Sequence, residues 1–298
     1  MRIATHSVSD TILRQIQQLN SDQAKLQTQV STGLRISQPE DDPAAFARVV
    51  NFQSELRQNA QYASNAATAL ATSQASYAGL KSLKDVSDRA GEIAALGNDV
   101  LGSGTMQSYA VEVNQLIEQA TQVANSTYQG NSLYAGTAID AAAFTVNRNS
   151  AGQVTSVSYA GDSGQMPIAL SSGTTVNPGS TGATNAGLGD FINRLIALRD
   201  GLAAGDATAV NATKSGLLDG ENTIVSAMAE AGGIQSRISA AQTQLASQAT
   251  TLTGLITNDA GTDITTAVVK LSQTQTAYQA ALQSAGKILN LSLLDYLR

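Results

Sequence analysis

Residues 264–289 read ITTAVVKLSQTQTAYQAALQSAGKIL, and apolar side chains recur along this stretch in steps of four and three. Residues 12–30, ILRQIQQLNSDQAKLQTQV, repeat the same seven-residue pattern near the other end of the chain. A heptad pattern predicts a helix that packs against a partner helix. We therefore expect the two terminal segments to form helices that pair with each other, with neighbouring copies of the chain, or with both.

The positions that we expect to be buried, within one chain and between subunits, follow this pattern. They are Ile12, Ile16, Leu19, Leu26, Val30, Ile264, Val268, Leu271, Tyr278, Leu282, Leu289, Leu293 and Leu294. The rest of these segments is rich in alanine, serine and glutamine, which contribute less than the roughly 1.5–3 kcal/mol of a large buried side chain. Isolated helices are also marginal in water. We expect such seams to bury enough surface only when several subunits contribute.

The composition argues against several classes of protein. The 298 residues carry a net charge of -6 and only 13% charged residues, so they offer no basic stripe for a nucleic acid. No stretch approaches the ~20 apolar residues of a membrane span, and the first thirty residues lack the apolar region of a cleavable signal peptide. The chain has no cysteine, which excludes disulfides and thiolate metal sites. We expect neither a nucleic-acid nor a membrane partner.

Breaker residues and periodicity predict the order of the elements. We expect helices over about 5–33, 43–97 and 105–125, then one from 191 to the Gly205-Asp206 break, one from there to about 258, and a last one from about 263 to 298. Between 129 and 189, charged residues are few and short alternating runs at 143–146 and 154–160 predict strands. The predicted fold class is mainly α, a long antiparallel helical rod with a small β-rich insert.

This order predicts three domains. The first is a terminal coiled-coil domain of residues 1–38 and 262–298. The second is a helical rod domain of residues 39–136 and 190–261. The third is a β-rich outer domain of residues 137–189.

An acidic turn separates the first two predicted helices. Within residues 37–43, Asp42 is placed to cap a helix that has proline at its first position. Arg35 and Arg48 flank this turn, so Arg35, Asp41, Asp42 and Arg48 either stay solvated or make salt bridges between neighbouring subunits. No further carboxylates follow at the spacing of a calcium loop, so we expect no metal site.

One tetrapeptide imitates a catalytic motif. Gly161-Asp162-Ser163-Gly164 copies the sequence around the nucleophile of chymotrypsin-like proteases, but the chain has a single histidine, His6, in a different, helical region. We expect a turn in which glycine supplies a positive φ and Asp162 caps backbone N–H groups. We therefore expect no catalytic residue and no cofactor, and we do not expect an enzyme.

Several motifs resemble the flagellin superfamily. The resemblance covers about residues 1–145 and 190–298. It rests on Met1-Arg2-Ile3-Ala4-Thr5, on Ser31-Thr32-Gly33-Leu34-Arg35-Ile36-Ser37 with Asp41-Asp42-Pro43, on Gly130-Asn131-Ser132-Leu133-Tyr134-Ala135-Gly136 leading to Phe144, and on Ser292-Leu293-Leu294-Asp295-Tyr296-Leu297.

Within that superfamily, the Asp-Asp-Pro turn and the Leu-Leu-Asp-Tyr-Leu ending favour a subunit of the hook-filament junction. Filament flagellin, which shares the terminal design, stays the alternative. One departure is Ala142-Ala143-Phe144, where the family often has a proline before the phenylalanine.

The resemblance implies a structural part of the bacterial flagellum, outside the cell, exported unfolded by the flagellar type III apparatus and assembled as a ring that seats the filament. It implies copies of the same chain as partners, with another hook-associated protein on the hook side and flagellin or a neighbouring junction layer on the filament side. It also implies a cytosolic export chaperone on the C-terminal helix, and terminal helices that become ordered on assembly.

Overall fold

The computed structural model describes residues 2–97 and 103–296, with side chains over 10–97 and 104–287. The chain is mainly helical, as the sequence predicts. The helices are α1 (Arg2–Thr32), α2 (Pro43–Leu96), α3 (Ser103–Ala124), α4 (Gly182–Ala204), α5 (Ala207–Ala260) and α6 (Ile264–Tyr296).

Short strands between α3 and α4 form the predicted β-rich insert. They are β1 (Thr127–Tyr128), β2 (Asn131–Ser132), β3 (Phe144–Arg148), β4 (Val154–Tyr159), β5 (Ile168–Ser171) and β6 (Thr174–Val176). Among the described residues they pair as antiparallel two-stranded sheets, β1 with β2, β3 with β4 and β5 with β6. The predicted fold class, helices with a small β insert, is confirmed.

Local capping sets the ends of the first two helices. α1 ends where Gly33, with a φ of 71°, takes the left-handed conformation and donates its N–H to the Gln29 carbonyl at 2.9 Å. α2 begins directly after Asp42, whose Oδ1 accepts the Ala45 N–H at 3.0 Å. The cap and the proline at the first helical position lie where the sequence predicts them.

The start of α4 differs from the prediction. The helix begins at Gly182 rather than near 191, because the Thr181 hydroxyl accepts the Thr184 N–H at 3.2 Å and caps it. The first turn contains glycine, alanine, threonine and asparagine, so no large apolar residue marks the start of the helix in the sequence. The β-rich domain predicted over residues 137–189 therefore ends in a helix, because residues 182–189 belong to α4.

Contacts divide the chain into two compact units. Unit 1 is Met1–Gln58 with Gln248–Arg298, and unit 2 is Asn59–Ser247. Unit 1 contains α1, α6, the start of α2 and the end of α5. The β strands belong to unit 2, together with α3, α4 and the larger parts of α2 and α5. The division into three domains predicted from the sequence stays a prediction.

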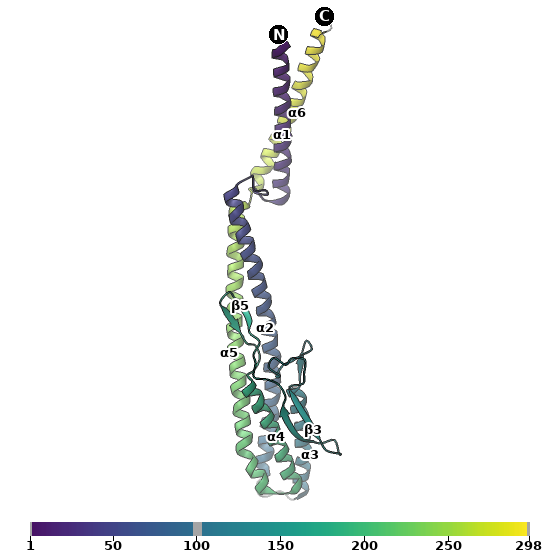
Figure 1. The fold of residues 1–298 in the computed structure, drawn as a ribbon, viewed down its shortest axis with the longest axis vertical. Helices are drawn as coiled ribbons and strands as arrows, with labels where there is room; N and C mark the ends of the chain where they lie inside the picture. The colour runs from purple at the N-terminus through teal and green to yellow at the C-terminus, as the bar shows by residue number, and fades with distance from the viewer. Residues whose placement is uncertain (1, 98–102, 297–298) are drawn as a thin grey trace. The chain divides into compact units, whose positions relative to one another are not determined.

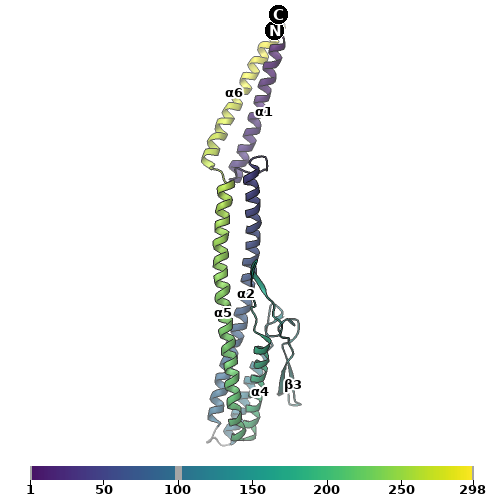
Figure 2. The same cartoon turned by 60° about the vertical axis from the view of Figure 1, so that its left-hand side comes forward.

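In unit 1, α1 and α6 lie side by side and run antiparallel, so the two chain ends lie at the same end of the pair (Figure 1). Figure 2 shows the same pairing from another side. A small apolar cluster joins the start of α2 to the end of α5 through Ile36, Ala45, Val49 and Ala260.

In unit 2, the main core lies between helices and the β3–β4 hairpin. α3 packs against α4, and β4 packs against α4; Figure 1 and Figure 2 show the hairpin beside α4. The largest fully buried side chains are Tyr134, Phe144, Phe191, Leu80, Leu83, Ile93, Ile117, Leu188, Ile192, Leu195, Leu198 and Leu202.

Two asparagine side chains fix the β3–β4 hairpin to the helices. The Asn125 Oδ1 accepts the Phe144 N–H at 2.8 Å, and its Nδ2 donates to the Phe144 carbonyl at 3.0 Å. On the other strand, the Asn193 amide bonds in the same way to the N–H and carbonyl of Val157, at 2.9 and 2.8 Å. The two amides thus pair with backbone N–H and carbonyl groups that point away from the partner strand of the hairpin.

Tyr134 links the insert to α2. Its Oη donates to the Ser76 carbonyl at 2.8 Å, and burial raises the pKa of Tyr134 to about 12. Gly79, on the same helix, leaves room for this hydroxyl, because a Cβ there would lie 2.3 Å from Tyr134 Oη.

Candidate assembly site

α1 presents a half-buried stripe in its pairing with α6. The stripe consists of the heptad positions Ile12, Ile16, Leu19, Gln23, Leu26 and Val30. The two helices pack against each other. None of these side chains is fully buried in the single chain, so α6 alone does not complete their cover.

The side chains of α6 that are covered in the single chain are not the set that the heptad pattern favours. Its most covered positions are Ala267, which is 3% exposed, and the half-buried Leu271, Thr274, Tyr278, Ala281 and Ala285. These recur in steps of four and three, and they share only Leu271, Tyr278 and Ala285 with the predicted pattern. The inner seam of α6 is thus built mostly from small residues.

The larger predicted residues form an exposed apolar flank beside this seam. Ile264 is 53% exposed, and Val268 and Leu282 are each 46% exposed. At about 100° per residue, the three lie within about 40° of each other around the helix. We call Ile264, Val268 and Leu282 the apolar flank. On α1, Leu13 is also 56% exposed.

Three predicted assembly positions lie outside the described side chains. Leu289, Leu293 and Leu294 belong to α6, whose backbone is described through Tyr296. Their burial therefore stays a prediction.

The junction is the part of unit 1 where α1 passes into α2 and α5 passes into α6; it comprises residues 33–48 and 256–263. Here the two connections bond to each other through the backbone. The Arg35 N–H donates to the Ala260 carbonyl at 2.6 Å, and the Thr262 N–H donates to the Gly33 carbonyl at 2.9 Å. Leu34 and Gly261 form an antiparallel bridge between these bonds.

Asp259 binds both arginines that flank the predicted turn. Its carboxylate accepts two bonds from Arg48, Nε to Oδ2 and Nη2 to Oδ1, each 2.9 Å. The bidentate contact raises the pKa of Arg48 and lowers the pKa of Asp259. Arg35 Nη2 donates to the Asp259 carbonyl at 2.9 Å.

Asp41 organises the turn itself. Its Oδ1 lies 2.6 Å from Lys25 Nζ of α1, and its Oδ2 accepts the N–H groups of Ser37 and Gln38 at 3.0 and 3.2 Å. The Lys25 contact, followed by the Ser37 N–H, lowers the pKa of Asp41 to about 2. The turn is therefore held to α1 by a charge-assisted bond.

The partners that complete these ion pairs, Lys25 and Asp259, are residues that sequence reasoning missed. Asp259 lies 211 positions from Arg48 along the chain, so no local spacing pairs them. The four predicted residues Arg35, Asp41, Asp42 and Arg48 do gather at the junction, with their contacts inside one chain. Salt bridges from this turn to a neighbouring subunit stay a prediction.

The protease-like tetrapeptide forms a turn, but its glycines act differently from the prediction. Asp162 Oδ1 accepts the N–H groups of Thr137 and Gly164 at 2.8 and 2.9 Å, as a capping aspartate should. The prediction of a positive φ is wrong, because neither Gly161 nor Gly164 has one. Glycine is needed for space: a Cβ at Gly161 would lie 2.6 Å from Tyr159 Oη.

Within the described residues, no group of three or more histidine, cysteine, aspartate or glutamate residues could hold a metal ion. Across the described helices, none combines the length and the apolarity needed to cross a bilayer. The side chain of His6 lies outside the described side chains.

Comparison with known families places the N-terminal half. Residues 3–138 match the bacterial flagellin N-terminal helical region. Flagellar hook-associated protein 3 from Salmonella typhimurium is 32% identical over 148 residues, which are 48% of this chain and 46% of that protein. The match thus spans about half the length of this relative.

Solved structures share the fold. A flagellar hook-associated protein from Vibrio parahaemolyticus has a TM-score of 0.65 and 21% identity, covering 74% of this chain and 100% of that one. FlgL from Bacillus cereus has a TM-score of 0.60 and 18% identity, with 69% and 98% covered. The flagellar junction protein FlgL from Legionella pneumophila has a TM-score of 0.54 and 13% identity, with 72% and 100% covered.

The resemblance read from the sequence motifs is thereby confirmed. The chain is flagellin-like and similar to hook-associated protein 3. The similarity is to flagellar proteins, and it favours a structural role in the flagellum over an enzyme.

Proposed function

We propose that this flagellin-like chain is the junction subunit between hook and filament, and that its copies assemble as a ring that seats the filament. The similarity to hook-associated protein 3 supports the class of protein. The apolar flank is the observation that carries the assembly step, because about half of each of its side chains is open to solvent in the single chain.

The flank gives assembly a driving force. Fully burying a large apolar side chain contributes roughly 1.5–3 kcal/mol, so covering the exposed half of each flank residue contributes about 0.7–1.5 kcal/mol. Three such residues supply about 2–4.5 kcal/mol per subunit before association costs. That amount favours contact only where many subunits repeat it, as in a ring.

The small inner seam supports a role in matching two different structures. Ala267, Thr274 and Ala281 place few bulky groups between α1 and α6. Such a seam lets the two helices shift slightly against each other at little cost in packing. A junction subunit needs this freedom, because one side must fit a hook-associated protein and the other flagellin or a neighbouring junction layer.

Export uses the same surface in this proposal. The chain leaves the cell unfolded through the flagellar type III apparatus and reaches the flagellum outside the cell. Before export, a cytosolic chaperone covers the apolar flank of α6 by helix-in-groove binding.

Deletion of the gene tests the role. We expect the deletion strain to build hooks and to release filament subunits into the medium, and the intact gene to restore attached filaments. Hooks that fail to form, or filaments that stay attached, would contradict the junction role.

Polymerisation of the purified chain separates the proposal from the filament alternative, since the flagellin N-terminal helical region is common to both. We expect the chain to stay monomeric in high salt and after seeding. Long filaments that the chain seeds by itself would instead identify a filament subunit.

A further inference from the structure

The apolar core of unit 2 is interrupted along its two longest helices, α2 and α5. The buried residues of one apolar cluster extend to Leu80 on α2 and to Ala227 on α5. A second cluster resumes at Ala69 on α2 and Ile238 on α5. Both clusters lie within unit 2, and both helices run through them without a break. We call the two parts the β3–β4 segment and the β5–β6 segment, after the hairpin that each cluster contains.

Small and polar residues fill the stretch between the two segments. We call this stretch, residues 71–79 of α2 and 229–233 of α5, the waist. Its buried residues are Ser73, Ser76 and Ala231. Gln235 Nε2 donates to the Ser73 carbonyl at 3.2 Å, so the two helices face each other at this level. The Ser73 hydroxyl is buried without a hydrogen-bond partner among the described residues. The waist therefore lacks the apolar packing that holds each segment together.

Two adjacent glycines stand in the waist without a packing reason. A Cβ at Gly232 or at Gly233 would meet no atom within 4 Å. Elsewhere in α5 glycine is needed for space, since a Cβ at Gly220 would lie 2.6 Å from Phe191 Cδ2. Glycine in a helix interior is less stable than alanine, because it loses more backbone freedom on folding. The pair therefore weakens α5 at the level where the apolar core is interrupted.

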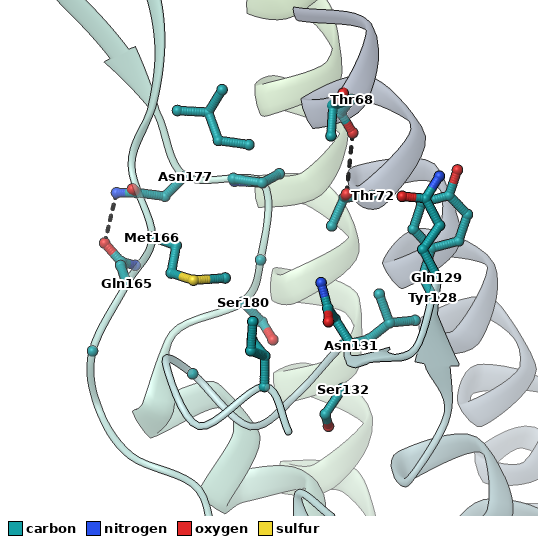
Figure 3. A pocket seen from close by; sticks show the side chains of 17 residues that line it. Thr68, Thr72, Tyr128, Gln129, Asn131, Ser132, Gln165, Met166, Asn177 and Ser180 are labelled. Carbon is teal, nitrogen blue, oxygen red and sulfur yellow. Dashed lines mark hydrogen bonds between the residues drawn. The ribbon is translucent and has the colours of Figure 1, made fainter. Parts of the chain in front are cut away.

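The β insert leaves open space beside the waist. A pocket of about 270 Å³ lies between α2, the β1–β2 hairpin and the loops at 164–168 and 177–180. In Figure 3, Thr68 and Thr72 of α2 stand across this space from Gln165 and Asn177. The pocket leaves room for α2 to move relative to the loops.

We propose that the waist is a hinge at which the β3–β4 segment and the β5–β6 segment bend against each other. The apolar cluster of each segment keeps that segment rigid. The glycine pair lets α5 absorb the bend in its backbone angles, and α2 bends at the same level because its buried side chains there are serines. The hinge lies wholly within unit 2, so the proposal does not depend on the junction role.

Hydrogen exchange of the full-length chain tests the hinge through local opening. We expect the α5 amides of the waist to exchange faster than those of residues 217–226 and 238–245 in the same helix. Replacing both glycines, Gly232→Ala with Gly233→Ala, should slow exchange in the waist by about fifteen- to thirtyfold. The matched control is Gly254→Ala, at a position of α5 outside the waist where a Cβ also meets no atom within 4 Å. It should leave exchange in the waist unchanged.

Uniform exchange along α5 would overturn the proposal. Unchanged exchange in the variant with both alanines, or equal slowing of the waist by the control, would also overturn it.

Distances between spin labels test the bend itself. The chain has no cysteine, so two introduced cysteines carry the only labels. Ser64→Cys on α2 and Gln122→Cys on α3 place labels at exposed positions on opposite sides of the waist. With the native glycines, this pair should give a broader distance distribution than with both alanines. The pair Gln122→Cys and Ser215→Cys lies within the β3–β4 segment and should give equal widths in both backgrounds. Equal widths for the pair across the waist would overturn the proposal.

Discussion

Leu282→Asp separates the stability of the single chain from its ability to assemble. Leu282 is 46% exposed, so an aspartate there stays in water in the isolated chain. The variant loses the burial of the covered half of the side chain, which lowers the free energy of unfolding by about 0.7–1.5 kcal/mol. The sequence pattern placed Leu282 in a buried stripe, and the structure moves the expected damage from folding to assembly.

In the assembled ring the cost is larger. The variant loses about 0.7–1.5 kcal/mol of apolar burial, and an unpaired carboxylate buried at the contact adds several kcal/mol. A total of at least about 3 kcal/mol weakens each subunit contact more than a hundredfold. We therefore expect the exported variant to be absent from hooks.

Two measurements check this prediction. Urea unfolding of the purified chain gives the change in stability, and immunoblots of isolated hooks and of the medium give the fraction of exported subunit that is incorporated. The matched control is Ala280→Asp, which puts the same charge on an exposed position of α6 about 200° away around the helix. Normal incorporation of Leu282→Asp, or equal loss with Ala280→Asp, would refute the reasoning.

Other predictions concern the fold of each unit. Gly79→Ala should destabilise unit 2 by about 1–3 kcal/mol in urea unfolding, because its Cβ would lie 2.3 Å from Tyr134 Oη; in a Tyr134→Phe background it should be neutral or stabilising, and an unchanged cost there would contradict the clash. Since the pKa of Asp41 is lowered to about 2, its contact with Lys25 stabilises the fold above pH 4 and is lost as the pH falls from about 4 to about 2. The melting temperature of Asp41→Asn should thus lie below that of the parent at pH 7 and converge with it near pH 2, whereas a constant difference would exclude this contact. Asn193→Ala should cost about 1–3 kcal/mol and abolish hydrogen-exchange protection of the Val157 N–H, and retained protection would show that the amide does not hold β4.

Local signals in the sequence were sufficient for several helix boundaries. Gly33, the Asp42 cap and the Gly205-Asp206 break each act on the backbone within a few residues, so the end of α1, the start of α2 and the break between α4 and α5 could be read directly. The start of α4 could not, because its first turn holds no large apolar residue and its cap is a single threonine hydroxyl.

The seam of α6 shows that a heptad pattern alone does not decide which of two registers packs within the chain. Two registers share Leu271, Tyr278 and Ala285, and hydrophobicity favours the one that adds Ile264, Val268 and Leu282. The chain packs α1 against the register that adds Ala267, Thr274 and Ala281. A pattern ranked by side-chain size cannot distinguish a contact within the chain from a surface that waits for another subunit.

Long-range contacts were also beyond the sequence. Asp259 and Lys25, which pair with Arg48 and Asp41, come from helices whose placement no spacing reveals.

Solvent access at Val268 in the assembled flagellum tests the central claim, that neighbouring copies cover the apolar flank. The chain has no cysteine, so Val268→Cys introduces a single thiol, and Ala280→Cys gives an exposed control on the same helix. Maleimide labelling should be fast for both variants in the purified monomer. In isolated hooks that retain the protein, Val268→Cys should be protected while Ala280→Cys still reacts; equal labelling of Val268→Cys in monomer and hook would contradict the account.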